Sequence, residues 1–369
     1  MWVMNSWYVA AFSAEIGEKP TPRRLLGEPV LMYRCSNGTV AALQDRCPHR
    51  LVPLSSGQRI GDEIQCSYHG LRFAADGRCT HIPGQAIIPS NSRATSYPLV
   101  ERQGLVWIWL GNRSLADEAL VPDFPWMADA HWRQSPGYHR FGCDYRLMTD
   151  NLLDLSHETY VHHHTIGNRA AQTIADFPVK VTVEDGLVIR VHREMPRIDP
   201  PPFFAMILQS REPIDRWQTA IHMPPSIHMT EAGVHLTGSP RSSAFVSRVM
   251  HLLTPETPTS THYFWSVVRN YRCEDDSMTK AVAVSVGATF DEDQVVLELQ
   301  QKALLERDGG VPRFALKLDE APMRARRFLE KLLEAQIEDP SFRSPVSPLV
   351  PNESETPAMM ASGASLAVG

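Results

Sequence analysis

Asp150-Asn151-Leu152-Leu153-Asp154-Leu155-Ser156-His157-Glu158-Thr159-Tyr160-Val161-His162 places two histidines on or near one helix, with several carboxylate and carboxamide side chains. Asn151, Asp154 and His157 repeat every three residues, so a helix sets them along one slanting face. His162 follows His157 by five residues, a step of about 500°, or about 140° past a full turn. The two imidazoles therefore reach one metal ion only if the helix unwinds or ends between them. We predict a break near residues 160–162.

Two histidines and one carboxylate form the facial triad of non-haem Fe(II) oxygenases, which leaves coordination positions open for dioxygen and substrate. The same stretch also fits an amphipathic core helix with a polar stripe, because the helix dipole favours histidine near a C-terminus. The stretch alone does not separate the two interpretations. The N-terminal part of the chain favours the metal site.

Composition and charge indicate an ordinary globular protein of two or more domains. The 369 residues are 43% hydrophobic and 21% charged, and the net charge is 36 − 42 = −6. No basic block points to nucleic acid, and no apolar run is long enough to span a membrane. Residues 1–15 lack the basic segment of a secretory signal, and six cysteines in a chain of this length do not form a disulfide scaffold. We therefore expect a reducing, cytoplasmic compartment.

Residues 1–115 are predicted to form a small β-rich domain. The apolar runs 29–34 and 39–43 flank Asn37-Gly38, a strong hairpin signal, and residues 105–110 form a further strand candidate closed by a glycine. Short strands at close intervals are typical of a small sandwich or barrel.

This region contains Cys47-Pro48-His49 and Cys66-Ser67-Tyr68-His69, so each of two loops offers one cysteine and one histidine. Two cysteines and two histidines could hold a structural zinc ion, but zinc modules usually group Cys-x-x-Cys apart from the histidine pair. One cysteine and one histidine per loop is what a Rieske [2Fe–2S] centre needs, with two thiolates on one iron and two imidazoles on the other. The spacing strongly favours the Rieske cluster.

The rest of the chain is predicted to form an α+β domain, residues 116–343, entered by a proline-containing linker over 115–145. An Asp185-Gly186 turn indicates a hairpin, and further strands are predicted over 217–222, 228–236, 246–253 and 261–269. A helix is predicted from about Phe290 to Arg307, with three acids in its first turn, and one of those acids could be a third metal ligand. A second helix is predicted over 320–336, and residues 344–369 are expected to be a disordered tail.

A Rieske motif followed by Asn-x-x-Asp-x-x-His-x4-His resembles the oxygenase components of Rieske non-haem iron oxygenases, over about residues 1–340. The likeness is greatest to the group of vanillate O-demethylase, dicamba O-demethylase and toluenesulfonate methyl-monooxygenase. It is carried by Asn5-Ser-Trp-Tyr-Val-Ala-Ala11, Cys66-Ser-Tyr-His-Gly-Leu71, Ile82-Pro-Gly84, Asn151-Leu-Leu-Asp-Leu-Ser-His157, Leu253-Thr-Pro-Glu-Thr257 and His262-Tyr-Phe264.

The resemblance implies a helix-grip-like antiparallel sheet with helices that hold a mononuclear iron. It assigns the iron to His157, His162 and Asp293. Asp291 is the second choice, and Glu158 is expected to point away from the metal. Asp154 matches the family's bridging acid, which joins a cluster histidine of one subunit to an iron-site histidine of the next in a head-to-tail homotrimer. Asn151 of the same motif completes the candidate catalytic residues.

The resemblance also implies the reaction. Electrons from NAD(P)H pass through a separate ferredoxin or flavin reductase to the cluster and then to Fe(II), which activates O2 to hydroxylate a C–H bond of an aromatic acid. Hydroxylation of a methoxy carbon gives a hemiacetal that collapses to a phenol and formaldehyde. The alternatives are a ring-hydroxylating mono- or dioxygenase, a pure electron-transfer Rieske protein and a zinc-stabilised binding protein.

The substrate residues are the least determined part of the sequence. By the resemblance, His251 lies in the pocket, although a histidine satisfied within a strand explains the sequence equally well. Thr230 and His222 on neighbouring strands are weaker candidates. Arg216 and Arg248 are possible partners for a substrate carboxylate.

Overall fold

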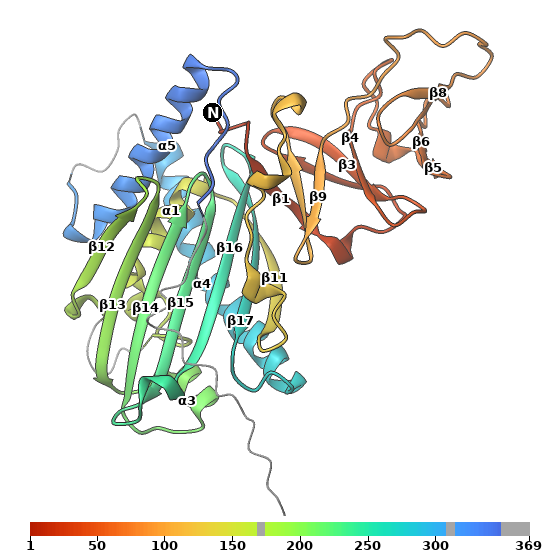
Figure 1. Ribbon diagram of the computed structural model, residues 1–369. Coiled ribbons are helices and arrows are strands. Elements are labelled where there is room, and N and C mark those ends of the chain that lie inside the picture. The colour runs from red at the N-terminus through yellow and green to blue at the C-terminus, as the bar shows by residue number, and fades with distance from the viewer. Residues whose placement is uncertain (168–173, 308–313, 348–369) are drawn as a thin grey trace, which may run out of the picture.

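The computed structural model describes residues 1–167, 174–307 and 314–347 (Figure 1). It consists of an N-terminal β-rich part and a large antiparallel sheet with helices on one face. The N-terminal strands are β1 (Trp7–Phe12), β2 (Thr21–Leu25), β3 (Glu28–Arg34), β4 (Val40–Gln44), β5 (Gln58–Ile60), β6 (Glu63–Gln65), β7 (Arg72–Phe73), β8 (Cys79–His81), β9 (Leu99–Arg102) and β10 (Leu105–Trp109).

The N-terminal strands form three small sheets in the orders β1-β10-β9, β2-β3-β4 and β5-β6-β7-β8. The hairpin of β3 and β4 turns at Asn37-Gly38, where Gly38 has a φ of 86°, so this prediction is confirmed. In Figure 1 the sheet of β5 to β8 lies farthest from the large sheet. The opposite side of this β-rich part packs against the large sheet, where Thr254 donates a hydrogen bond of 2.7 Å to the carbonyl of Val9.

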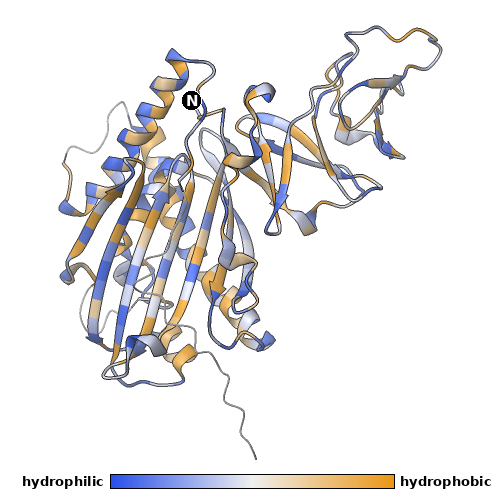
Figure 2. Ribbon diagram, in the orientation of Figure 1, coloured by the Kyte–Doolittle hydropathy of each residue, from blue (hydrophilic) through white to orange (hydrophobic). Residues whose placement is uncertain are grey.

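The large sheet has seven strands in the order β11-β17-β16-β15-β14-β13-β12, all antiparallel. Its hairpins confirm the strands predicted after residue 179. Hydrophobic and hydrophilic residues alternate along many of these strands in Figure 2. β16 and β17 are nevertheless buried at most positions, because residues of the N-terminal part such as Trp107 pack on the face opposite the helices. The strands are β11 (Arg133–Phe141), β12 (Val179–Glu184), β13 (Val188–Ile198), β14 (Ile214–Met223), β15 (Ile227–Leu236), β16 (Phe245–Thr257) and β17 (Ser260–Arg269).

The prediction of a linker over 115–145 is wrong for the second half of that range, because residues 133–141 form strand β11. Among the described strands, β11 pairs with β17 alone and so lies at the edge of the sheet. An edge position tolerates Pro136, which lacks the N–H that a central strand would need. The proline that indicated a linker therefore marks an edge strand.

The helices pack on one face of the large sheet (Figure 1). They are α1 (Tyr145–Leu153), α2 (Glu158–Val161), α3 (Pro202–Leu208), α4 (Asp276–Glu306) and α5 (Glu320–Glu338). The helix predicted over 320–336 is confirmed as α5. None of the described helices is long and apolar enough to cross a membrane.

Helix α4 begins fourteen residues before the predicted start at Phe290, so the acids at 291–293 lie in its middle rather than in its first turn. Its N-cap is Asp275, whose side chain accepts a hydrogen bond from the Met278 backbone N–H. The early turns mix alanine with valine, threonine and one glycine, Gly287, which are poorer helix formers. Their buried face, Met278, Val282, Val286 and Phe290, repeats every four residues, so packing overrides local propensity.

The predicted disordered tail begins at residue 344, but Ser344 is buried and its backbone N–H donates to the carbonyl of Asn5 at 3.0 Å. The chain is thus tied back to the N-terminal segment at this point. Residues 348–369 lie outside the described residues.

Candidate metal centres

The stretch that carries both histidines is a helix with two interruptions. α1 ends at Leu153 and is followed by a 3-10 turn, Leu155–His157, and then by α2, which ends at Val161. The break predicted near residues 160–162 is confirmed, but the interruption at Asp154 was not predicted. The Asp154 side chain accepts hydrogen bonds from the backbone N–H and hydroxyl of Ser156, at 3.0 and 2.6 Å. Aspartate forms such local bonds outside regular helix, so the single slanting face expected for Asn151, Asp154 and His157 does not form.

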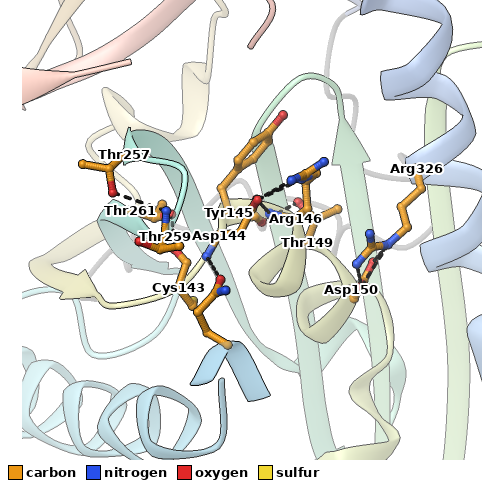
Figure 3. A network of polar contacts seen from close by, with 11 residues as sticks. Cys143, Asp144, Tyr145, Arg146, Thr149, Asp150, Thr257, Thr259, Thr261 and Arg326 are labelled. Carbon is orange, nitrogen blue, oxygen red and sulfur yellow. Dashed lines mark hydrogen bonds and ion pairs between the residues drawn. The ribbon is translucent and has the colours of Figure 1, made fainter. Parts of the chain in front are cut away.

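Figure 3 shows how α1 is anchored ahead of these interruptions. Asp150 accepts a hydrogen bond of 3.0 Å from Nε of Arg326 on α5. The backbone N–H of Asp144, the N-cap of α1, donates to Gln301 of α4 at 2.9 Å. Contacts to two other helices therefore fix the position from which the histidines project.

His157, His162 and Asp293 come together, with one ligand atom from each lying within 4.8 Å of the others. Oδ1 of Asp293 is 3.4 Å from Nε2 of His157 and 3.2 Å from Nε2 of His162. The Nδ1 atoms point elsewhere, to the carbonyl of Asp154 at 2.6 Å and to the carboxylate of Glu292 at 2.9 Å. Because those oxygens only accept, both Nδ1 atoms carry a proton, and the Nε2 atoms of both rings face the shared space, where a bound metal ion would take their lone pairs.

The charges of this set fit a divalent cation. Burial by itself would raise the pKa of Asp293, but the two imidazoles outweigh it and hold that pKa well below its usual range. Burial opposes protonation of His157 and His162, yet the Asp293 carboxylate raises the pKa of both. Asn151 donates a further hydrogen bond of 3.0 Å to Oδ1 of Asp293 and orients it. One anionic oxygen and two imidazole nitrogens around one point are the donors of a non-haem iron triad.

The two other carboxylates considered as ligands lie elsewhere. Asp291 is exposed and pairs with His139 at 3.2 Å. Glu158 is not part of the triad, although it lines the same cavity, and it forms a buried ion pair with Arg216, at 2.7 and 3.2 Å, in which both side chains are 2% exposed. Gln218 donates to the same carboxylate.

A cavity of about 100 Å³ adjoins the triad. Among the predicted substrate residues, His251, Thr230 and Arg216 line it, whereas His222 does not and packs on His228, with 4.4 Å between ring centroids. Sequence reasoning missed the Phe203–Phe204 wall and Gln218. Alternation along the predicted strand would have placed Gln218 on the same face as Arg216. The remaining lining residues include Asn151, Leu152, Leu155, Ile166, Ala232, Ser247, Val249, Val267, Val286, Thr289 and Phe290.

The four candidate cluster ligands lie on two neighbouring loops of the N-terminal part. Cys47 and Cys66 are buried, while His49 and His69 are exposed with 4.7 Å between their ring centroids. Burial raises the pKa of the Cys47 thiol to about 11, against a backbone hydrogen bond at His49 that lowers it, and a bound metal ion would favour the thiolate. Among the described residues, the set of three or more ligand atoms close enough to share one ion is the His157 triad. The two buried cysteines and the two exposed histidines are therefore arranged for two separate iron atoms, as in a [2Fe–2S] cluster, rather than for one zinc ion.

Comparison with known proteins agrees with this geometry. Residues 6–92 match the Rieske [2Fe–2S] domain, and residues 141–335 match the vanillate O-demethylase oxygenase C-terminal domain. The chain is 38% identical to a vanillate O-demethylase oxygenase subunit of a Pseudomonas species, over 92% of this chain and 97% of the relative. It is also 38% identical to the oxygenase component of dicamba O-demethylase from Stenotrophomonas maltophilia, over 90% and 98%.

Solved structures show the same fold. The crystal structure of dicamba monooxygenase bound to 3,6-dichlorosalicylic acid superposes with a TM-score of 0.86 at 36% identity, covering 92% of this chain and 99% of the other. A crystal structure of that enzyme with non-haem iron and dicamba covers 91% and 99%, with a TM-score of 0.77 and 35% identity. The predicted α+β fold, the oxygenase class and the two kinds of iron cofactor are thereby confirmed. The chain belongs to the Rieske non-haem iron oxygenases, in the family that shares the C-terminal domain of the vanillate O-demethylase oxygenase.

Proposed function

We propose that this protein is the oxygenase component of a Rieske monooxygenase that removes a methyl group from a methoxylated aromatic acid, or hydroxylates a ring methyl. The observation that carries the proposal is the His157–His162–Asp293 triad facing a largely apolar cavity. The relatives named above as O-demethylases support this substrate class. A toluene-4-sulfonate monooxygenase subunit of Comamonas testosteroni, 35% identical over 91% of this chain, supports the methyl-hydroxylation form.

Each of the two proposed domains, 1–115 and 116–343, would hold one metal centre. Cys47, His49, Cys66 and His69 would hold the [2Fe–2S] cluster, and His157, His162 and Asp293 would hold the iron. When bound, the cluster supplies electrons and the iron(II) activates O2 for C–H hydroxylation. On a methoxy carbon, one oxygen atom enters the C–H bond and the other leaves as water, with two electrons and two protons consumed. The hemiacetal then collapses to a phenol and formaldehyde.

The protein positions the substrate and excludes water. Burial, with a smaller effect of Asp293, raises the pKa of Tyr263 well above its usual range, so its phenol stays protonated and donates to Nδ1 of His251 at 2.5 Å. Burial also lowers the pKa of His251 to about 3, which keeps the imidazole neutral. Nε2 of His251 therefore carries its proton and donates to the Thr230 hydroxyl at 3.1 Å. The Thr230 hydroxyl proton is left to donate to a substrate oxygen, while the apolar walls hold the ring.

The assembly completes the proposal. A separate NAD(P)H-dependent ferredoxin or flavin reductase would supply electrons in the cytoplasm, and a head-to-tail homotrimer would bring the cluster of one copy to the iron of the next. Asp154, beside His157 and partly exposed, is the proposed bridge between the two centres.

A single turnover tests the function. Protein of verified iron content is chemically reduced, then mixed with oxygen and a panel of methoxy-, methyl- and unsubstituted aromatic acids. Formaldehyde from a methoxyarene is the expected result. A hydroxylated methyl without formaldehyde would select the second form of the proposal. Hydroxylation of an unsubstituted ring would instead favour a ring-hydroxylating oxygenase, and no product from any panel member would overturn the substrate class.

A further inference from the structure

Two nitrogens of a buried arginine that shares a cleft with Asp154 find no acceptor in the described part of the chain. Arg193 on β13 is 4% exposed, and its Nε and Nη1 atoms are buried without a hydrogen-bond partner among the described residues. A buried guanidinium without an acceptor is strongly unfavourable, and most buried polar groups in folded proteins are bonded to protein or to ordered water. Arg193 therefore requires a partner in the working protein.

Arg193 and Asp154 line the same cleft, which lies between the end of α1 and the start of α5. The cleft has a volume of about 20 Å³. A buried water molecule needs about 10–15 Å³ and two or more polar partners, so the cleft has room for one bridging water. The other polar side chains that line it are Gln218, Lys317 and Glu320, and its remaining walls are apolar.

The carboxylates near Arg193 differ in what they can still accept. Both oxygens of Glu158 are bonded to Arg216 or Gln218. Glu320 pairs with Arg324 at 2.9 Å on the surface. Asp154 uses Oδ1 for both bonds from Ser156, and its Oδ2 accepts no hydrogen bond from the described residues. Burial lowers the pKa of Arg193. The negative charges of Asp154 and, to a smaller extent, of Glu158 raise that pKa and so oppose the effect of burial.

We propose that Arg193 is the positioning residue of Asp154. Through water in the cleft it holds the free oxygen of the carboxylate, so that Asp154 meets the cluster histidine of the next copy in a fixed orientation. The inference rests on the proposed function, in which Asp154 bridges the two metal centres. Its consequence is kinetic, because Arg193 touches neither iron nor substrate but sets how fast one electron leaves the reduced cluster and reduces ferric iron.

The test measures that transfer without any substrate. Holoenzyme with oxidised cluster and ferric iron is reduced at the cluster by a light flash, and the return of the oxidised-cluster absorbance is followed together with the loss of the ferric EPR signal. Arg193→Met removes the donors at similar size and should slow the transfer about tenfold or more, as for other residues that orient metal ligands. Arg193→Lys keeps the charge and should lie between Arg193→Met and wild type.

Two controls make the outcome specific. Arg190→Met removes a guanidinium from the other face of β13, where it pairs with Glu184 at 2.7 Å, and should leave the rate unchanged. In an Asp154→Asn background, Arg193→Met should add no further slowing, because both changes act on one link. A wild-type rate in Arg193→Met, or additive slowing in the double variant, would overturn the inference. A failed turnover panel would count against the proposed function alone, since these rates need no substrate.

Discussion

Acidification should destabilise the large sheet, because several of its imidazoles are buried in the neutral form. Burial lowers the pKa of His222 to about 3, and the backbone of Ile227 offsets only part of this effect. Burial likewise lowers the pKa of His251 to about 3 and that of His228 well below its usual range. These groups take up protons in the unfolded chain long before they do so in the folded one.

The magnitude follows from the pKa of His222. An unfolded histidine titrates near 6.5, and pH 5 lies about 1.5 units lower, so protonation stabilises the unfolded state by about 2 kcal/mol at pH 5. The folded state stays neutral at pH 5 because its pKa is about 3. The folded pKa is depressed, so this stability is present above about pH 6.5 and is lost as the pH falls toward 3.

The assay is urea unfolding of the metal-free protein at pH 7 and pH 5, followed by tryptophan fluorescence. His222→Phe should reduce the difference in unfolding free energy between the two pH values by about 2 kcal/mol. His81→Gln, at an exposed position, serves as the control. It should show the same difference in unfolding free energy between the two pH values as the wild type. If His222→Phe showed the wild-type pH dependence, the conclusion that burial keeps His222 neutral would be wrong.

Three further predictions concern the metal centres and the pocket. Asp293→Ala should lose the mononuclear iron but keep the two iron atoms of the cluster, as measured by iron content and by cluster absorbance. Equal loss from both centres would contradict the assignment of Asp293 as a ligand of the mononuclear iron. Glu158→Gln leaves Arg216 buried without its anionic partner and should cost about 3–5 kcal/mol in urea unfolding, whereas Glu158→Leu combined with Arg216→Met should recover most of it. Asp154→Asn should keep both metals but lose reductase-driven turnover, and full activity would refute the bridge.

The ligand chemistry of both centres could be predicted from the sequence because it depends on which donor atoms a short stretch offers. Cys47 and His49 stand two residues apart on one loop, as a Rieske cluster requires, wherever the domain sits. The strands after residue 179 and their turns were also predictable, because alternation and Asp-Gly turns are local signals. The break beside His162 followed from helix geometry alone.

The tertiary structure decided what depends on distant contacts. Asn151 and Asp293 are 142 positions apart in the chain, so the family resemblance, and not spacing, distinguished Asp293 from Asp291 until the fold placed one inside and the other in solvent. Packing against the sheet starts α4 well before its acids, and pairing with β17 turns an expected linker into β11. The sequence has no signature for the pairing of Glu158 with Arg216, or for the two Arg193 nitrogens that find no partner among the described residues. Burial and partnership depend on which distant residues pack nearby.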